Sequence, residues 1–169
     1  MEKIIQAGNL TKVYGEKETS VTALDNIDVQ FNENEFTAIM GPSGSGKSTL
    51  LHCLAGLDRP TSGQILLKDQ DISTLNDKQL TKIRRDSFGF VFQAFNLIPT
   101  LTAEENITLP ASIAGRKPDM DWIKQVVETV DISDRLTHRP NELSGGQQQR
   151  VAAARAMATK PEVIFADEP

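Results

Sequence analysis

Three short motifs in this sequence combine residue types that suit phosphate chemistry. The glycine-rich run GPSGSGKST occupies residues 41–49, the pentapeptide LSGGQ occupies residues 143–147, and an acidic pair stands at Asp167 and Glu168. Glycine amides, a lysine and hydroxyl groups can hold phosphate oxygens, whereas carboxylates can bind a hard cation or orient a water molecule. Phosphate loops occur in many unrelated nucleotide enzymes. The glycine pair of the LSGGQ pentapeptide is therefore the more specific indication of the class of protein.

The glycine-rich run lies where a phosphate loop is expected. Residues 35–40 (EFTAIM) form a β-favouring apolar run before it, and Leu50, Leu54 and Leu57 follow at helical spacing. A strand, this loop and a helix are the context in which G-x-x-x-x-G-K-S/T binds phosphate. Lys47 is expected to neutralise the β and γ phosphates, and the Ser48 hydroxyl to coordinate Mg²⁺. The full expected contact set is Gly41, Pro42, Ser43, Gly44, Ser45, Gly46, Lys47, Ser48 and Thr49.

The acidic pair follows a second predicted element of the same sheet. Residues 162–166 (EVIFA) are nearly all apolar, as in a buried parallel strand. Ligands of open α/β sheets bind beyond the carboxyl ends of the strands, so Asp167 is placed to hold Mg²⁺ and Glu168 to orient or deprotonate water. Taken alone, such a pair fits ordinary surface carboxylates equally well. Another strand is predicted at residues 88–92, and Gln93 follows it. Taken alone, a glutamine at this position fits a solvated turn residue.

The pentapeptide predicts the start of a helix over residues 145–158. Ser144 and Gln147 have the spacing of a capping box, and an apolar pattern follows them. A plain helix start leaves the glycine pair unexplained, because each glycine costs up to about 1 kcal/mol relative to alanine in a helix. Bare amides at a helix N-terminus suit the close approach of a phosphate.

Composition excludes several classes of protein. The 169 residues hold 18 basic and 23 acidic side chains without a basic stripe, so nucleic acid is not an expected partner. The longest apolar stretches fall far short of the roughly 20 residues that cross a bilayer. The single cysteine, Cys53, excludes an internal disulfide and is expected to be a small buried apolar residue; a reducing cytoplasm fits best.

With these motifs in view, the chain resembles the ATP-binding subunits of ABC transporters. Supporting segments are FVFQ at 90–93, Asn96-Leu97, LSGGQQQR at 143–150 and DEP at 167–169. Softer similarities at 21–24 and 95–99 indicate the branch with lipoprotein-release, macrolide-export and cell-division proteins. The resemblance implies an α/β P-loop NTPase fold with a mixed sheet core, an N-terminal antiparallel β portion and an inserted helical subdomain. It divides the chain into a nucleotide-binding core (1–93), a helical subdomain (94–139) and a signature helix with the catalytic strand (140–169).

The resemblance also implies residue roles. Tyr14, which composition alone describes as a half-buried strand aromatic, would stack on adenine. Gln93 would sense the γ phosphate and bind the metal, and Gln93 and Glu168 would be the catalytic residues. Two subunits would pack head to tail around two ATP molecules, and contacts to the opposite subunit's nucleotide would come from Ser144, Gly145, Gly146 and Gln147. Predicted helices at 104–114 and 120–130, with Pro99, Pro110 and Pro118 punctuating them, would form the subdomain that faces a membrane partner.

The leading interpretation is an ATP-hydrolysing subunit that acts as a homodimer with Mg²⁺ and powers a separate transmembrane permease from the inner face of the cell membrane. One alternative is a nucleotide-gated interaction module with little turnover; a less favoured one is a soluble ABC ATPase of DNA repair or translation. The family pattern continues past Pro169 to a histidine for which His52 and His138 do not substitute. We therefore expect a domain that is incomplete at its C-terminus and weak or absent hydrolysis by these 169 residues alone.

Overall fold

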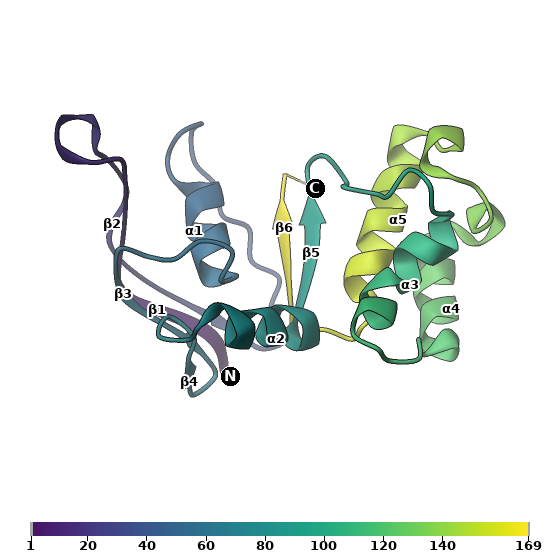
Figure 1. Ribbon diagram of the computed structural model, residues 1–169, viewed down its shortest axis with the longest axis horizontal. Coiled ribbons are helices and arrows are strands. Elements are labelled where there is room, and N and C mark those ends of the chain that lie inside the picture. The colour runs from purple at the N-terminus through teal and green to yellow at the C-terminus, as the bar shows by residue number, and fades with distance from the viewer. Residues whose placement is uncertain (1, 169) are drawn as a thin grey trace. The chain divides into compact units, whose positions relative to one another are not determined.

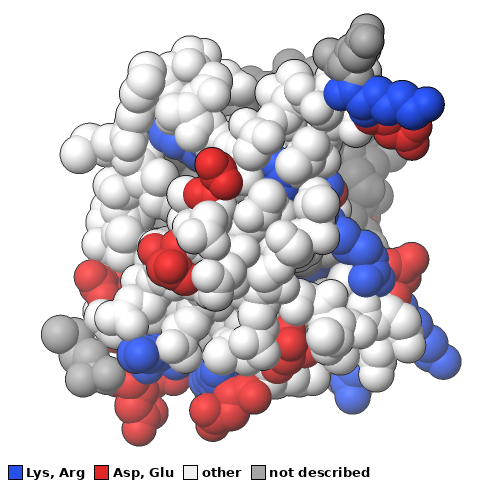
Figure 2. Space-filling model, turned by 90° about the vertical axis from the view of Figure 1, so that its left-hand side faces the viewer, with Lys and Arg blue, Asp and Glu red and all other residues white. Residues whose placement is uncertain are grey.

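The computed structural model describes residues 2–168, and the chain divides into two compact units (Figure 1). One unit ends at Lys82 and the other begins at Ile83, so the division falls within helix α2 (Asp77–Ser87). Pro169 of the predicted acidic motif lies outside the described residues. Figure 2 shows one face of the molecule, on which acidic and basic side chains are interspersed among uncharged ones.

The first unit is built on a four-stranded antiparallel sheet with the strand order β2-β1-β3-β4. The strands are β1 (Lys3–Tyr14), β2 (Val21–Asn32), β3 (Ser62–Leu67) and β4 (Gln70–Asp71), with a 3-10 turn η1 (Lys17–Thr19) between the first two. Ile5, Leu10 and Ile65 are almost completely buried in this unit. The expected N-terminal antiparallel portion is therefore confirmed.

Helix α1 (Lys47–Leu54) begins within the glycine-rich run and packs on β1 and β2. Gly56 ends the helix because it takes a left-handed conformation at φ 62°, and Leu57 N–H donates back to His52 O at 2.9 Å. The inclusion of Leu57 in the apolar helix face was therefore wrong, and its side chain is 43% exposed. Cys53 is fully buried as predicted, and burial raises the pKa of its thiol to about 11.

The predicted strand before the phosphate loop does not form in the structure. Residues 35–40 have no strand conformation, and Phe36 and Met40 are 96% and 89% exposed. A strand needs a neighbour to receive its backbone hydrogen bonds. Within residues 2–168 no strand pairs with this segment, so its apolar composition alone does not order it.

The second unit contains a parallel pair of strands, β5 (Phe88–Phe92) and β6 (Val163–Asp167). The first has its predicted bounds, and the second lies one residue later than predicted, so that Asp167 is its last residue. The rings of Phe88 and Phe165 pack edge to face across the pair at a centroid distance of 5.1 Å. Gly89 lets β5 approach helix α5 closely, since a Cβ at this position would collide with Ala156 O. The strand pair is thereby fixed against α5.

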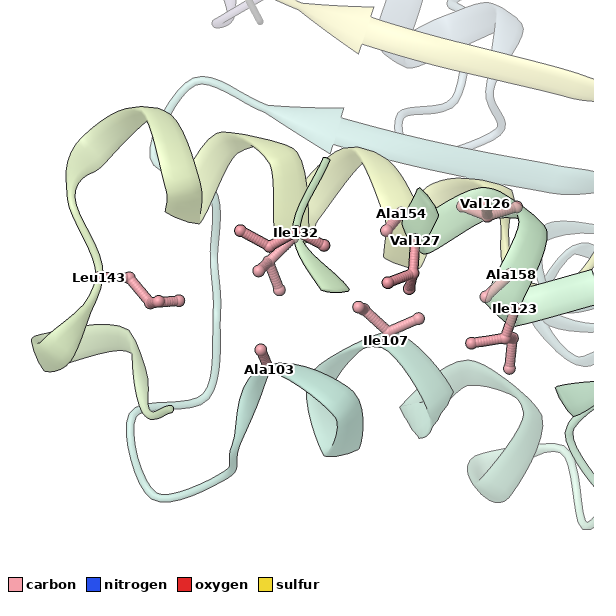
Figure 3. Packing of buried hydrophobic residues seen from close by; sticks show 10 residues of the cluster. Ala103, Ile107, Ile123, Val126, Val127, Ile132, Leu143, Ala154 and Ala158 are labelled. Atoms are coloured by element: carbon pink, nitrogen blue, oxygen red, sulfur yellow. The ribbon is translucent and has the colours of Figure 1, made fainter. Parts of the chain in front are cut away.

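Three helices form the remainder of this unit: α3 (Ala103–Ile113), α4 (Met120–Thr129) and α5 (Gly145–Met157), with the 3-10 turns η2 (Ser133–Arg135) and η3 (Pro140–Glu142). All three helices lie within one residue of their predicted bounds. Pro110 lies inside α3 and does not end it. Ile107, Val127 and Ala154 point toward one another from α3, α4 and α5 in the apolar core (Figure 3). Among residues 2–168, none of the helices combines the length and apolarity that a membrane span requires.

Candidate functional site

The glycine-rich run folds back on itself and is closed by its lysine. Lys47 Nζ donates to Gly41 O at 3.0 Å and to Pro42 O at 2.9 Å, and Ser45 N–H donates to Pro42 O at 3.3 Å. The lysine thus reaches across the mouth of the loop. Its ammonium is held by neutral carbonyl oxygens, which an anionic phosphate can replace with a stronger, charge-assisted partner.

Gly46 joins this loop to α1 and to the sheet. It takes a left-handed conformation at φ 87°, and a Cβ here would collide with the carbonyl oxygen of Ala23 on β2. Leu50 N–H donates to Gly46 O at 2.8 Å, so the helix begins directly after this glycine. Ser48 and Thr49 therefore lie in the first turn, where backbone N–H groups have no acceptor within the helix and the helix dipole is positive.

Tyr14 ends β1 in the same unit as the loop. Its side chain is 41% exposed, and its hydroxyl donates to Asp58 Oδ2 at 2.6 Å. Asp58 follows α1, so one hydrogen bond links the aromatic ring to the segment after the loop's own helix. Tyr14 is thus the strand aromatic that composition describes, but its side chain is exposed rather than half-buried.

In the second unit, β5 and β6 end at a common edge. Phe92 is the partner of Asp167 in the parallel register, so Gln93 and Glu168 follow their strands at the same edge. Both of these side chains are exposed, and Glu168 takes a left-handed backbone at φ 49°. Gln93 therefore lies at the edge of the strand pair that carries the acidic residues.

The loop that follows Gln93 is held by a residue that sequence reasoning missed. Phe95 and Asn96 both have left-handed backbones, with φ of 56° and 49°. Arg155 of α5 donates to their carbonyl oxygens, each at 2.7 Å. An arginine inside an alanine-rich helix carries no local signal of such a contact.

The LSGGQ pentapeptide begins α5 with the predicted capping box. Gln147 N–H donates to Ser144 Oγ at 3.3 Å, and Ser144 N–H donates to Gln147 Oε1 at 2.9 Å. Neither Gly145 nor Gly146 has a positive φ, and a Cβ at either position would meet no atom of the chain within 4 Å. Neither backbone conformation nor packing among the described residues requires these two glycines.

The predicted site residues thus fall into two groups. Tyr14 and residues 41–49 lie in the unit that ends at Lys82, whereas Gln93, residues 144–147 and the acidic pair lie in the unit that begins at Ile83. The second group has its predicted capping box and strand edge, whereas the strand predicted before residues 41–49 does not form. Asp58 and Arg155 are the contributors that the sequence did not reveal.

Several known proteins resemble this chain over most or all of its length. A family model described as ABC transporter matches residues 24–169. An uncharacterized ABC transporter ATP-binding protein of Thermotoga maritima is 48% identical over all of this chain and 73% of its own length. The lipoprotein-releasing system ATP-binding protein LolD of Cytophaga hutchinsonii is 46% identical over all of this chain and 76% of its own length. The macrolide export ATP-binding/permease protein MacB of Marinobacter nauticus is 46% identical, but the chain spans only 26% of it.

Solved structures of an ABC transporter cassette also resemble this chain. The dimeric structure of MJ0796, a bacterial ABC transporter cassette according to its description, matches 96% of this chain and 73% of its own with a TM-score of 0.88 and 46% identity. The same protein in a post-hydrolysis state bound to ADP and Pi matches with a TM-score of 0.87. These likenesses confirm the α/β P-loop NTPase fold and the branch that includes LolD and MacB. The chain belongs to the ABC transporter family and is an ATP-binding, ATP-hydrolysing component of that family.

Proposed function

We propose that this chain hydrolyses ATP between two head-to-tail copies and so powers a separate membrane permease of the export or lipoprotein-release type. The observation that carries the proposal is the open space around Gly145 and Gly146. These glycines weaken the first turn of α5, and no backbone or packing requirement among residues 2–168 explains them. They leave bare amides at a capped helix N-terminus, which suits contact with a phosphate held by a second subunit.

In this proposal the glycine-rich run holds the phosphates of the chain's own ATP. The amides of the loop and of the first turn of α1 surround the phosphate oxygens, and Lys47 moves from Gly41 O and Pro42 O to the β and γ phosphates. Tyr14, exposed at the end of β1, stacks on the adenine. Ser144 and Gln147 help to hold the γ phosphate of the opposite subunit.

The residues proposed for Mg²⁺ offer oxygen donors of the kind that this hard cation prefers: a hydroxyl from Ser48, an amide oxygen from Gln93 and a carboxylate from Asp167. Gln93 and Asp167 stand at one edge because Phe92 pairs with Asp167. Within residues 2–168 no three His, Cys, Asp or Glu side chains group around a metal position. Bound Mg²⁺ would neutralise charge on the phosphates. Glu168, next to Asp167, would orient and deprotonate the attacking water.

The partners follow from the same proposal. The dimeric state of MJ0796 and the names of the LolD and MacB relatives support a homodimer and a permease partner. We assign residues 94–139, which include α3 and α4, to a helical subdomain that faces the permease, between a core of residues 1–93 and a signature and catalytic segment of 140–169. The component would then lie in the cytoplasm, held on the inner face of the membrane by the permease.

Binding of Mg-ATP to this chain tests the first part of the proposal. Lys47→Ala is expected to abolish binding measured by calorimetry, because the only cation of the loop is lost. Lys78→Ala is the matched control, since Lys78 is exposed on α2 away from the loop in sequence. Equal affinity of wild type and Lys47→Ala would contradict the assignment of the phosphate loop.

The dimer is tested in the full-length protein. Glu168→Gln is expected to stop hydrolysis while leaving ATP bound, so an ATP-dependent dimer accumulates in size-exclusion chromatography with light scattering. Combining Glu168→Gln with Gly146→Arg, which covers the bare amides, is expected to remove the dimer. Turnover by Glu168→Gln at the parent rate would exclude Glu168 from the catalytic role.

A further inference from the structure

The carboxylate of Asp58 binds two side chains of β1 at once. Asp58 Oδ2 accepts from the Tyr14 hydroxyl at 2.6 Å, and Asp58 Oδ1 accepts from Lys12 Nζ at 2.6 Å. Lys12 Nζ also donates to Arg59 O at 2.7 Å. The two oxygens of one carboxylate therefore fix both the phenol and the ammonium.

Lys12 adds a second restraint on the aromatic ring. Its ammonium lies over the Tyr14 ring, 4.7 Å from the centroid, and its side chain is only 12% exposed. One face of the ring is thus occupied by a well-packed cation. The 41% exposure of Tyr14 leaves the opposite face as the one on which a flat base can stack.

The backbone of Asp58 is attached to the helix of the phosphate loop. Asp58 N–H donates to His52 O at 3.1 Å, and His52 belongs to α1, which begins at Lys47. A continuous set of contacts therefore runs from the phosphate loop through α1 and Asp58 to the ring of Tyr14. The distance that these contacts span is set by helix α1, which has eight residues and is a rigid spacer.

We propose that Asp58 is a positioning residue for the nucleobase: it holds the Tyr14 ring in its stacking orientation at a set distance from the phosphate loop. The inference rests on the proposed function, in which Tyr14 meets the adenine. A ring that is ordered before binding loses less conformational freedom when the base arrives, so the contact contributes more to affinity. Asp58 touches neither base nor phosphate and acts through Tyr14.

The titration of the two groups agrees with this geometry. The hydrogen bond to Asp58 raises the pKa of the Tyr14 phenol, because it stabilises the protonated form. Partial burial opposes ionisation of Asp58, but the hydrogen bonds from Lys12 and Tyr14 outweigh it and hold the pKa of Asp58 below its ordinary value. The phenol is therefore a donor and the carboxylate an acceptor over the whole neutral range.

Binding of two ligands, one with a base and one without, distinguishes an effect on the base contact from an effect on the phosphate contact. The affinities of Mg-ATP and of inorganic tripolyphosphate are measured by calorimetry for the wild type and for Asp58→Ala, Tyr14→Phe and the double variant. Asp58→Ala is expected to weaken ATP binding roughly three- to tenfold and to leave tripolyphosphate binding unchanged. The double variant is expected to weaken ATP binding by less than the two single changes combined, because both changes break the hydrogen bond between Tyr14 and Asp58. Asp69→Asn, an exposed carboxylate in the turn between β3 and β4, is the matched control.

The outcomes distinguish this inference from the proposed function. Equal weakening of ATP and tripolyphosphate would mean that Asp58 acts on the phosphate loop and would overturn the inference alone. Unchanged ATP binding in Asp58→Ala would do the same. A wild-type chain that binds no ATP would overturn the proposed function together with the inference that rests on it.

A second measurement needs no nucleotide. The sequence contains one tyrosine, so ultraviolet titration of the phenol reports on Tyr14 directly. In Asp58→Ala the pKa of Tyr14 is expected to fall toward its ordinary value near 10, and in Asp69→Asn to stay raised. Identical titration curves for wild type and Asp58→Ala would show that the carboxylate does not hold the ring, and the inference would be wrong.

Discussion

The guanidinium of Arg155 donates to the main-chain oxygen of Phe95 at 2.7 Å, joining the interior of α5 to the loop that follows β5. The same group donates to Asn96 O at 2.7 Å. Burial lowers the pKa of Arg155, because removal from water disfavours the charged guanidinium. One side chain therefore connects the helix that begins with the LSGGQ pentapeptide to the loop that begins at Gln93.

Removing this link is expected to loosen the loop. Arg155→Ala leaves two backbone carbonyls without their charged donor and should lower the free energy of unfolding by about 2–3 kcal/mol. Amide hydrogen exchange at residues 94–97 should accelerate more than exchange in α4. Arg150→Ala is the control, because Arg150 is exposed and pairs with the exposed Asp131. Unchanged exchange at 94–97 in Arg155→Ala would contradict the link.

Two glycine-to-alanine changes in the second unit should have opposite effects on stability. Gly146→Ala adds a methyl group into open space on a helix and should raise stability by up to about 1 kcal/mol. Gly89→Ala places a methyl group against Ala156 O and should destabilise by about 2 kcal/mol or more.

Thermal unfolding of both variants checks this pair, and ATP-dependent dimerisation of the full-length protein gives a second readout. Gly146→Ala should weaken the dimer although it stabilises the subunit, because its methyl group obstructs the approach of a phosphate. A Gly146→Ala protein that dimerises as well as wild type would count against the proposed contact in trans.

Asn106 should be a major determinant of stability in the helical unit. Its side chain is completely buried; it accepts from Ile98 N–H at 2.8 Å and donates to Ile98 O and Leu101 O, each at 3.2 Å, and to Thr102 O at 2.9 Å. Asn106→Ala should cost about 2–4 kcal/mol, since several buried backbone groups lose their partner at once. Denaturant unfolding measures the loss, with the exposed Asn141→Ala as control. A change below about 0.5 kcal/mol, the usual range for surface substitutions, would contradict this account.

The contacts of Asp58 should make stability depend on pH on the acid side. Because its pKa is lowered in the folded chain, the contribution of Asp58 is fully present above the unfolded value near 3.9 and is lost as pH falls through the folded value. The unfolding midpoints of wild type and Asp58→Asn should therefore differ most at neutral pH and converge toward about pH 3. Midpoints measured by circular dichroism across this range test the sign, and a difference that grows on acidification would contradict it.

Much of the site could be predicted because its signals are local. The capping box of Ser144 and Gln147 depends on residues three apart, and the strand that ends at Asp167 follows from an unbroken apolar run. The helices α3, α4 and α5 lie within one residue of their predicted bounds, and Thr102, Asp119 and Ser144 cap their N-termini. Backbone geometry within a few residues decides such features. The sequence alone therefore determined these features, and its motifs also determined the family.

Other features depend on where distant segments meet. The hydrogen bond between Tyr14 and Asp58 joins residues 44 positions apart, and the contact of Arg155 with Phe95 spans 60 positions. Residues 35–40 have the composition of a strand yet form none, because a strand exists only where a neighbour accepts its hydrogen bonds. The sequence by itself determined the chemistry of the motifs and the elements that carry them. Only the tertiary structure decided which side chains hold those motifs in position, because the path of the whole chain determines which distant residues come into contact.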